Sequence, residues 1–466
     1  MSRYPLASRY PQLLRELPYP GRTGVLGLFA PFADWAGAVL LDSGGHERGR
    51  FDLFSALPVR QLTTDGRLTR LHDHKGRLQG ESPADPFALL DQALRETKPV
   101  LDEARARTLP FAGGLLMALS YDLGRRLETL PALARQDLPL ADLHAGIYHW
   151  AVIVDHDSKT AGLWQFADLP DEQIARITAT LAAPAVTRVG FALDSDWHSN
   201  LDREHYGRAF RQVQDYIHAG DCYQINLAQR FSARCHGDAY AAYCTLSPLN
   251  KAPFSSYWHT DRGQILSLSP ERFVSVRDGV ALTEPIKGTR PRHADPMRDQ
   301  AEIDALKASE KDRAENLMIV DLLRNDFGKN CAIGSVKVPE LFTIHSFPAV
   351  HHMISSVTGA LAAGKTPLDL LRGCFPGGSI TGAPKVRAMQ IIEELEPHRR
   401  SLYCGSIGYC DYLGRLDSSI TIRTLVHADH QIHCWAGGGL VADSMEQAEY
   451  EETFAKVSKL LPPLRG

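Results

Sequence analysis

The sequence predicts an α+β fold with large antiparallel β-sheets packed with helices. Short β-rich runs between turns recur through the first third of the chain, and the clearest of them spans 147–154. The pair Asp278-Gly279 separates two apolar runs, which is a strong signal for a hairpin of antiparallel strands. Helical spacing of apolar residues appears at 206–217, 310–326 and 444–461. This mixture of hairpin signals and separate helices is typical of the α+β class.

Composition excludes several classes of function. The chain has 466 residues, a net charge of -4 and 44% hydrophobic residues. A slightly acidic balance of mixed sign disfavours a nucleic-acid binder, which usually shows a basic stripe. No stretch approaches the ~18 uninterrupted apolar residues of a membrane span, and residues 1–5 lack the apolar run of a secretory signal. Eight scattered cysteines without a Cys-x-x-Cys pair are typical of reduced thiols, so we expect a cytoplasmic protein.

Three regions can be separated along the chain. Residues 1–165 alternate short apolar runs with turns and carry no obvious catalytic cluster. Residues 166–198 are rich in alanine, proline and aspartate, and we expect them to connect two halves. Residues 199–466 hold the candidate catalytic groups, and we expect strands there at 342–357, 403–409 and 419–424.

The lysine at position 287 is the central candidate. It lies in the run Thr-Glu-Pro-Ile-Lys-Gly-Thr-Arg-Pro-Arg, whose prolines and glycine leave few ladder hydrogen bonds and present a side chain at a strand end. The hairpin at 278–279 returns the chain toward Glu271. A strict two-residue loop would put Glu271 and Lys287 on opposite faces, whereas a longer loop or a bulge would bring them to one face. We expect this shift; a solvated surface lysine is the alternative.

The helix expected at 310–326 carries a candidate acidic residue. Its apolar residues point all round, so we expect the helix to be buried. A buried Glu315 would then need a partner or a metal ion. Pairing with Arg313 or Arg324 is the alternative to a metal site.

The last helix offers two further carboxylates. At ~100° per residue, Glu449, Glu452 and Lys456 fall on one face, separate from an apolar face. A solvated charged stripe is the alternative interpretation.

Two glycine-rich segments are suited to binding anions. The loop 375–385 opens a helix near Pro384, and free backbone N–H groups at a helix start form a cradle for an anion. It is not a P-loop, because Ala383-Pro384 follows the last glycine; a phosphate-binding turn in another fold is the alternative. Three glycines at 437–439 follow an expected strand and let backbone amides approach a ligand closely.

Seven stretches together resemble the chorismate-utilising enzymes. The similarity is dense from about residue 200 onward and weaker before it, and the matching stretches are 220–226, 269–273, 285–289, 314–326, 376–385, 422–424 and 449–453. The resemblance implies a compact body in which the two sequence halves are intertwined. The nearest members carry lysine before Gly-Thr at 288–289, whereas anthranilate synthases usually have alanine there.

The resemblance implies a covalent route to 4-amino-4-deoxychorismate, on the way to p-aminobenzoate and folate. Lys287 would attack C2 of chorismate while the C4 hydroxyl leaves, ammonia would add at C4, and the lysine would be expelled. Hydroxide is a poor leaving group, so an acid is needed near the C4 oxygen, and Glu271 is similar to that acid in the family.

The resemblance also implies holders for the two carboxylates of chorismate. Mg²⁺ bound by Glu315 and Glu452 would take the ring carboxylate, helped by the amides of Gly437, Gly438 and Gly439. The remaining candidates are Glu449 and Asp312 in the same acidic cluster, as ligands or through water, Arg423 and Tyr403 for the enolpyruvyl carboxylate, and Lys456, His352 and Thr381 as further pocket residues. A packed histidine is the alternative for position 352.

No glutaminase signature is present, since the chain has no Gly-x-Cys-x-Gly turn. The resemblance therefore implies a separate glutamine amidotransferase subunit that supplies ammonia. It also implies a possible tryptophan pocket bordered by Ser43, Pro253 and Phe254, for which turn and packing roles are the alternative. The rival functions are anthranilate synthase component I, which Lys287 disfavours, and a non-catalytic regulatory subunit that binds tryptophan or chorismate.

Overall fold

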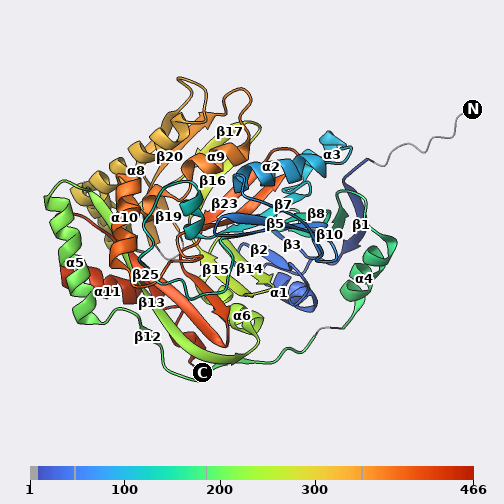
Figure 1. Cartoon of the computed structure of the whole chain (residues 1–466), viewed down its shortest axis with the longest axis horizontal. Helices are drawn as coiled ribbons and strands as arrows, with labels where there is room; N and C mark the ends of the chain where they lie inside the picture. Colours follow the sequence, from blue (N-terminus) through green and yellow to red (C-terminus); the bar gives the residue numbers. More distant parts are fainter. Residues whose placement is uncertain (1–8, 47–48, 185, 348–349, 466) are drawn as a thin grey trace, which may run out of the picture.

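The computed structural model describes residues 9–46, 49–184, 186–347 and 350–465. In this part of the chain the strands form two large sheets, and every pair of neighbouring strands is antiparallel (Figure 1). This arrangement confirms the predicted α+β class with large antiparallel sheets.

The two sheets are described by their strand orders. The first sheet runs β1 (Gln12–Leu17), β10 (Thr160–Gln165), β9 (Trp150–Asp155), β3 (Phe51–Ser55), β2 (Val39–Asp42), β14 (Phe254–Thr260), β15 (Gly263–Ser269), β24 (Thr424–Ala428), β25 (Gln431–Leu440), β13 (Gln224–Gly237) and β11 (Phe191–Leu193), with β12 (His198–Ser199) and β21 (Gly382–Ala383) also on β13. The second sheet runs β18 (Ile286–Pro291), β20 (Val350–Ala360), β17 (Val280–Thr283), β16 (Arg272–Arg277), β23 (Leu416–Ile420), β22 (Ser406–Asp411), β7 (Gly114–Leu119), β8 (Leu143–Tyr148), β4 (Arg60–Asp65), β5 (Leu68–Asp73) and β6 (Leu78–Ser82), with β19 (Lys337–Ser346) on β20.

Both sheets combine strands from distant parts of the sequence. In the first sheet β2 lies between β3 and β14, and in the second β7 pairs with β22. The expected intertwining of the two halves is therefore confirmed. The segment 166–198, expected to be a connection, contains a helix and the edge strand β11.

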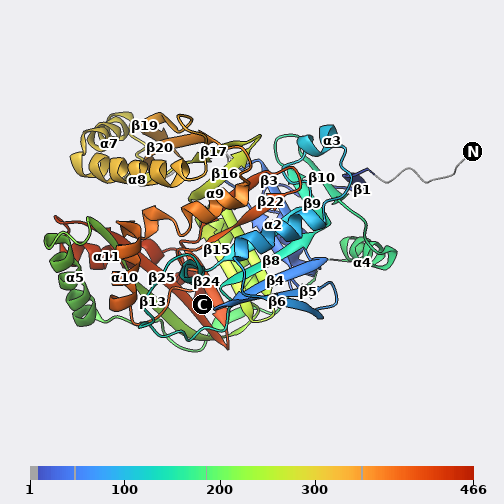
Figure 2. The ribbon, with the colours of Figure 1, turned by 45° about the horizontal axis from the view of Figure 1, so that its top comes forward.

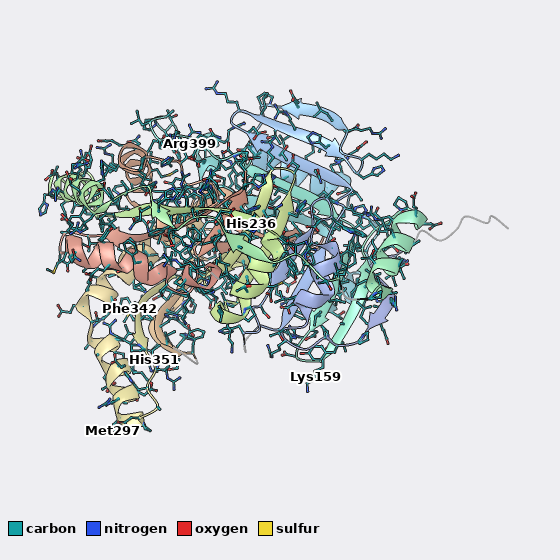
Figure 3. All side chains as sticks on the ribbon, turned by 90° about the horizontal axis from the view of Figure 1, so that it is seen from below. Lys159, His236, Met297, Phe342, His351 and Arg399 are labelled. Atoms are coloured by element: carbon teal, nitrogen blue, oxygen red, sulfur yellow. The ribbon has the colours of Figure 1, made fainter. Side chains whose placement is uncertain are left out.

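Helices cover the outer faces and one end of the sheets. They are α1 (Val25–Phe29), α2 (Pro86–Glu96), α3 (Glu103–Thr108), α4 (Asp171–Ala182), α5 (Arg203–His218), α6 (Ala239–Asn250), α7 (Pro296–Ala308), α8 (Glu310–Gly328), α9 (Pro367–Cys374), α10 (Lys385–Leu395) and α11 (Glu446–Val457), with short 3₁₀ turns η1 (Ala30–Phe32), η2 (Tyr121–Arg126), η3 (Gly378–Ile380) and η4 (Pro462–Leu464). Figure 2 shows α7 and α8 with β19 and β20 as a layer above α5, α10 and α11. In Figure 3 this layer projects from the body, with the exposed Met297 at its end.

The main core lies between the two sheets. Val39 and Ile265 of the first sheet share one buried cluster with Met117 and Ile407 of the second. Strand β7 is buried at every position, so its run Gly-Leu-Leu-Met-Ala-Leu is apolar without alternation. None of the helices in the described ranges is both long enough and apolar enough to cross a membrane.

Several strands expected to be single are divided between the two sheets. The β-rich run 147–154 ends β8 at Tyr148 and starts β9 at Trp150, and these strands belong to different sheets. The segment 419–424 is likewise the end of β23, a crossing, and the start of β24. The expected single strands at these two places are therefore wrong, and the crossings between them hold candidate site residues.

Candidate functional site

Glu271 and Arg423 occupy two segments in which the chain passes from one sheet to the other. Residues 270–271 link β15 to β16, and residues 421–423 link β23 to β24. The Ile420 N–H donates to the Glu271 carbonyl at 3.1 Å, and the Ser269 hydroxyl donates to the Ile420 carbonyl at 2.6 Å. Hydrogen bonds thus join the two crossings, which fixes an acid and a guanidinium at the ends of paired strands.

The Glu271 carboxyl is buried among positive charges. It is 9% exposed, and burial raises its pKa from 4.5 to about 7. The charges of Lys287, Lys456 and Arg423 act in the opposite direction, as does a long hydrogen bond of 3.5 Å from the Ser379 hydroxyl. A carboxyl group with this pKa is protonated in part near neutral pH, so it can donate a proton to a leaving group.

The hairpin does not bring Lys287 to Glu271 by the register shift that the sequence suggested. Arg277 pairs with Val280, so the turn has two residues, and both Asp278 (φ 49°) and Gly279 (φ 75°) are left-handed. Of the two routes to the expected shift, a longer loop and a bulge, the longer loop is therefore not used, because the Asp-Gly pair suits the tight turn.

A bulge appears instead in the lysine's own strand. Strand β18 pairs with β20, and the register changes between Ile286, which faces Ile354, and Thr289, which faces His352. Strand β17 ends before Pro285, which has no N–H group for a ladder hydrogen bond. Strand β18 then begins at Ile286 and pairs with β20. Lys287 is half-buried and close enough for its charge to act on Glu271, although no ion pair joins these two described residues.

Carboxylates of α8 and α11 face each other beside the lysine. Burial raises the pKa of Glu315; Lys287 and Lys311 oppose this, while the charge of Glu449 adds to it. Burial also raises the pKa of Glu449, which accepts a hydrogen bond of 2.7 Å from the Ser444 hydroxyl. The charge of Glu449 acts on Glu315, and Lys311 acts on both, so two carboxyl groups from different helices share one electrostatic environment.

The alternative pairing of Glu315 with an arginine is not present. Arg313 lies over the ring of Phe342, Arg324 pairs with Asp321 at 2.7 Å, and within the described chain the ion-pair partner of Glu315 is Lys311 at 4.0 Å. Helix α8 is buried on one face only, since Leu317 is 45% exposed. The expectation of burial all round is wrong because apolar residues such as Leu317 point to solvent.

Glu452 and Lys456 form an ion pair at the edge of the site. Their charged atoms lie 2.6 Å apart, and the lysine also donates to the Gly437 carbonyl at 2.8 Å. A side chain at Gly438 would meet Glu449 Oε2 at 2.9 Å, so the absence of one lets α11 approach β25 closely. Within the described ranges, no three or more His, Cys, Asp or Glu side chains are grouped closely enough to hold a metal ion.

The three glycines lie inside β25 rather than after it. They pair with residues 226–228 of β13, while β24 pairs with β25 only as far as Cys434. The expected end of the strand before Gly437 is wrong, because the ladder with β13 continues to Leu440. In the described chain, the other edge of this glycine segment has no strand partner and can present backbone groups to a ligand.

A second group of candidates consists of Arg423, His352 and Tyr403. Burial of the guanidinium lowers its pKa, although the residue keeps an exposed surface, and no described carboxylate is ion paired with it. Burial lowers the pKa of His352 to about 4, and the charge of Arg423 contributes. The His352 ring is fixed by Thr289 Oγ1, 2.8 Å from Nδ1. Tyr403 lies in a turn before β22, not in the expected strand, and stacks on Trp435 with centroids 6.2 Å apart.

The loop 375–385 contacts the site through Ser379, whereas its other polar groups are used internally. Thr381 is fully buried and donates to the Gly377 carbonyl at 3.0 Å. Lys385, the first residue of α10, pairs with the buried Asp326 at 2.7 Å and donates to the Cys374 carbonyl at 2.9 Å. The side chain of the first residue of α10 is thus used in an ion pair within the protein.

Asp312 is engaged by an arginine. Arg290 Nη2 lies 3.1 Å from Asp312 Oδ2, on the first turn of α8. The charge of Asp312 acts on Glu315, but the ion pair with Arg290 directs the Asp312 carboxylate toward β18.

The sequence did not single out Ser379, Lys311 or the buried pair Arg400 and Glu396. The Arg400 guanidinium donates to the Asn226 carbonyl at 2.6 Å and lies 5.6 Å from the ring centroid of Tyr403. The serine could have been found because it lies in the glycine-rich run; nothing local marks Arg400 as buried.

The residues of the suggested tryptophan pocket line one cavity. It has a volume of about 310 Å³, and Ser43, Pro253 and Phe254 line it together with residues 417–419 of the second sheet. The buried Ser43 and Ser256 hydroxyls have no hydrogen-bond partner among the described residues. The cavity therefore offers unpaired hydroxyl groups in a mixed lining that contains apolar residues such as Phe254 and charged residues such as Arg272 and Asp417.

Comparisons with known proteins give one consistent family. A family model described as chorismate binding enzyme matches residues 51–462. The chain is 51% identical over 440 residues to aminodeoxychorismate synthase component 1 of Klebsiella aerogenes, which covers 94% of this chain and 96% of that protein. It is 37% identical over 422 residues to anthranilate synthase component 1 of Thermus thermophilus, with 89% and 90% covered. The crystal structure of anthranilate synthase component I from Streptococcus pneumoniae matches with a TM-score of 0.77 and 28% identity, covering 89% of this chain and 92% of that one.

Proposed function

The chain belongs to the chorismate-binding enzymes, and we propose that it is the chorismate-aminating component of an aminodeoxychorismate synthase. The observation that carries the proposal is Lys287 beside a buried Glu271 whose pKa is about 7. A binding subunit needs neither a nucleophile nor an acid next to it. The high identity to an aminodeoxychorismate synthase component over nearly the whole chain supports the same function.

In the proposed reaction the Lys287 amine forms a bond to C2 of chorismate. The ring double bonds shift and the C4–O bond breaks, with a proton from Glu271 so that water leaves. Ammonia then forms a bond to C4, and the C2–N bond breaks to return the lysine. Glu271 is fixed at a crossing between the sheets, so the proton donor keeps its position through both steps.

Two groups of side chains would hold the two carboxylates of the substrate. Arg423, which has no ion-pair partner in the described chain, would bind the enolpyruvyl carboxylate near the ring of His352, and Tyr403 is proposed to contact the same carboxylate. The open edge of β25 at Gly437–Gly439 would face the ring carboxylate, with Lys456 nearby.

The carboxylates beside the lysine suit Mg²⁺. Glu315, Glu449 and Glu452 supply oxygen donors only, and the absence of a side chain at Gly438 lets two of them, Glu449 and Glu452, lie close to β25. Mg²⁺ commonly takes one or two protein carboxylates and completes its shell with water and substrate oxygens, so a dense protein cluster is not required. When bound, it would supply positive charge to the ring carboxylate.

Ammonia would come from a partner glutamine amidotransferase, since the relative in Klebsiella aerogenes is component 1 of its synthase. The cavity beside Ser43, Pro253 and Phe254 would hold tryptophan, whose indole would pack against the apolar lining residues and whose polar groups would meet the unpaired serines.

Product analysis with chorismate, Mg²⁺ and ammonium tests the proposal. An aminated product that keeps its pyruvate group supports it, whereas anthranilate with free pyruvate would assign the rival activity. The Lys287→Ala variant should lose a covalent adduct that intact mass measures after chorismate is added without ammonium. Lys307→Ala, an exposed lysine on α7, is the matched control and should keep the adduct. An unchanged adduct in Lys287→Ala would reject the nucleophile.

A further inference from the structure

The backbone at the lysine carries an extra residue. Between the pairs Ile286–Ile354 and Thr289–His352, two residues of β18, Lys287 and Gly288, oppose one residue of β20. Bulges of this kind bend a strand and change the direction of a side chain. Gly288 has φ 78°, a left-handed conformation that glycine adopts without strain. The direction of the Lys287 side chain therefore depends on what holds this bulge.

The space above Gly288 is filled by the junction of α7 and α8. A Cβ at this position would lie 2.8 Å from Leu306 Cδ1 and 2.9 Å from Asp312 Cγ. Leu306 is fully buried in the last turn of α7, and Asp312 lies in the first turn of α8, where its N–H is capped by the Ser309 hydroxyl. The side chain of Asp312 is thus packed against the residue that directly follows the nucleophile.

A guanidinium connects this carboxylate to the bulged strand. Arg290 Nη2 lies 3.1 Å from Asp312 Oδ2, and Arg290 Nη1 donates to the Thr289 carbonyl at 2.9 Å. The Asp312 side chain is 18% exposed, so this pair is partly shielded from solvent. One arginine therefore binds the α8 carboxylate and the backbone of β18 at the same time.

The same geometry argues against a metal contact for this aspartate. The guanidinium places a full positive charge next to the carboxylate, which opposes the approach of a divalent cation. Among the described residues no arginine pairs with Glu315, Glu449 or Glu452; their charged neighbours are flexible lysines, Lys311 at 4.0 Å from Glu315 and Lys456 at 2.6 Å from Glu452, rather than a guanidinium that is also bound to the backbone.

We propose that Asp312, together with Arg290, is a positioning residue for Lys287: the pair holds the bulge that aims the amine at the substrate, and Asp312 does not bind Mg²⁺. This inference rests on the proposed amination of chorismate. A misplacement of about 1 Å at a reacting group lowers the rate by on the order of a hundredfold, so the pair should affect turnover far more than binding.

The test compares Asp312→Asn, Arg290→Gln and the double variant. Each single variant should lower kcat about 10- to 100-fold and change KM for chorismate less than threefold. Because both substitutions break one unit, the double variant should be no more than threefold slower than the slower single variant. Asp321→Asn breaks an exposed ion pair on the same helix and is the control, with kcat unchanged. Thermal unfolding checks that each variant is folded. If Arg290→Gln is not folded, Arg290→Lys, which keeps the positive charge, is used in its place.

A second readout does not depend on turnover. Mn²⁺ takes the place of Mg²⁺, and its EPR signal in the presence of chorismate and the absence of ammonium measures binding. The Kd for Mn²⁺ should change less than threefold in Asp312→Asn. A rise of tenfold or more in the Kd for Mn²⁺ in Asp312→Asn but not in Arg290→Gln would make Asp312 a ligand and overturn the inference. A kcat within threefold of wild type in Asp312→Asn would overturn it as well. Failure of the proposed function itself would be distinct, because the wild-type protein would then form no aminated product.

Discussion

Replacement of Glu271 by glutamine should stabilise the protein at alkaline pH while it removes the proposed proton donor. Burial raises the pKa of this carboxyl from 4.5 to about 7, so folding makes its ionised form less favourable. Between these pH values the native state binds more protons than the unfolded state. The free energy of unfolding of the wild-type protein therefore falls as pH rises through this window.

The magnitude follows from the shift. About 2.5 pKa units correspond to roughly 3 kcal/mol at ~1.36 kcal/mol per unit, and about 2 kcal/mol of this develops between pH 5.5 and pH 8. Glutamine has nearly the same shape and no charge, so Glu271→Gln should lack this decline. The variant should also lose about 10²- to 10⁴-fold in kcat, which is the usual contribution of a proton-transfer group.

Urea unfolding of both proteins at pH 5.5 and pH 8, with kcat from product formation, measures the two effects. Glu172→Gln, an exposed carboxyl on α4, is the control and should show no comparable pH-dependent difference. Parallel losses of stability in the wild type and in Glu271→Gln between the two pH values would refute the argument that burial disfavours the ionised acid. A variant with more than a tenth of the wild-type kcat would refute the proton-donor role.

Two further substitutions test the binding groups. Arg423→Ala should raise KM for chorismate by 10- to 100-fold, since a hydrogen bond to a charged group contributes about 1.5–3 kcal/mol. Initial rates over a range of chorismate concentrations measure this. An unchanged KM would show that Arg423 does not bind the carboxylate. Gly438→Ala would place a methyl group 2.9 Å from Glu449 Oε2, so the Mg²⁺ concentration for half-maximal activity should rise at least tenfold, as measured by a Mg²⁺ titration of the rate. Gly27→Ala, which meets no atom within 4 Å, is the control, and equal Mg²⁺ requirements in both variants would contradict the proposed metal position.

The sequence predicted helices and turns correctly where a local pattern, such as the helical spacing of apolar residues or a turn-forming residue pair, is clear. The helical spacing at 206–217 and 310–326 corresponds to α5 and α8, and the Asp278-Gly279 pair forms the two-residue turn that its residue types favour. The acidic face of the last helix also corresponds to α11, with Glu449 turned inward. These features depend on neighbours in sequence, so the sequence contains enough information to predict them.

The arrangement of the two sheets could not be predicted in this way. Tyr148 and Trp150 are both buried and lie on either side of His149, yet they belong to strands of different sheets. Burial against a common core gives both sides of a crossing the same apolar character. The position of Lys287 could not be predicted for a similar reason, because its bulge lies in a strand that pairs with β20 and packs against α7 and α8, which are not its neighbours in the hairpin.

The pairing of early strands with late ones has a consequence for synthesis on the ribosome. Strand β2 pairs with β14, which lies more than 200 residues later in the sequence, and the separation between β7 and its partner β22 is larger still. At about 5–20 residues per second, β2 has an unpaired edge for roughly 10–40 s after it is made. Exposed edges of apolar strands readily pair with other chains. The nascent protein therefore keeps strand edges at which aggregation can start until its late strands have been made.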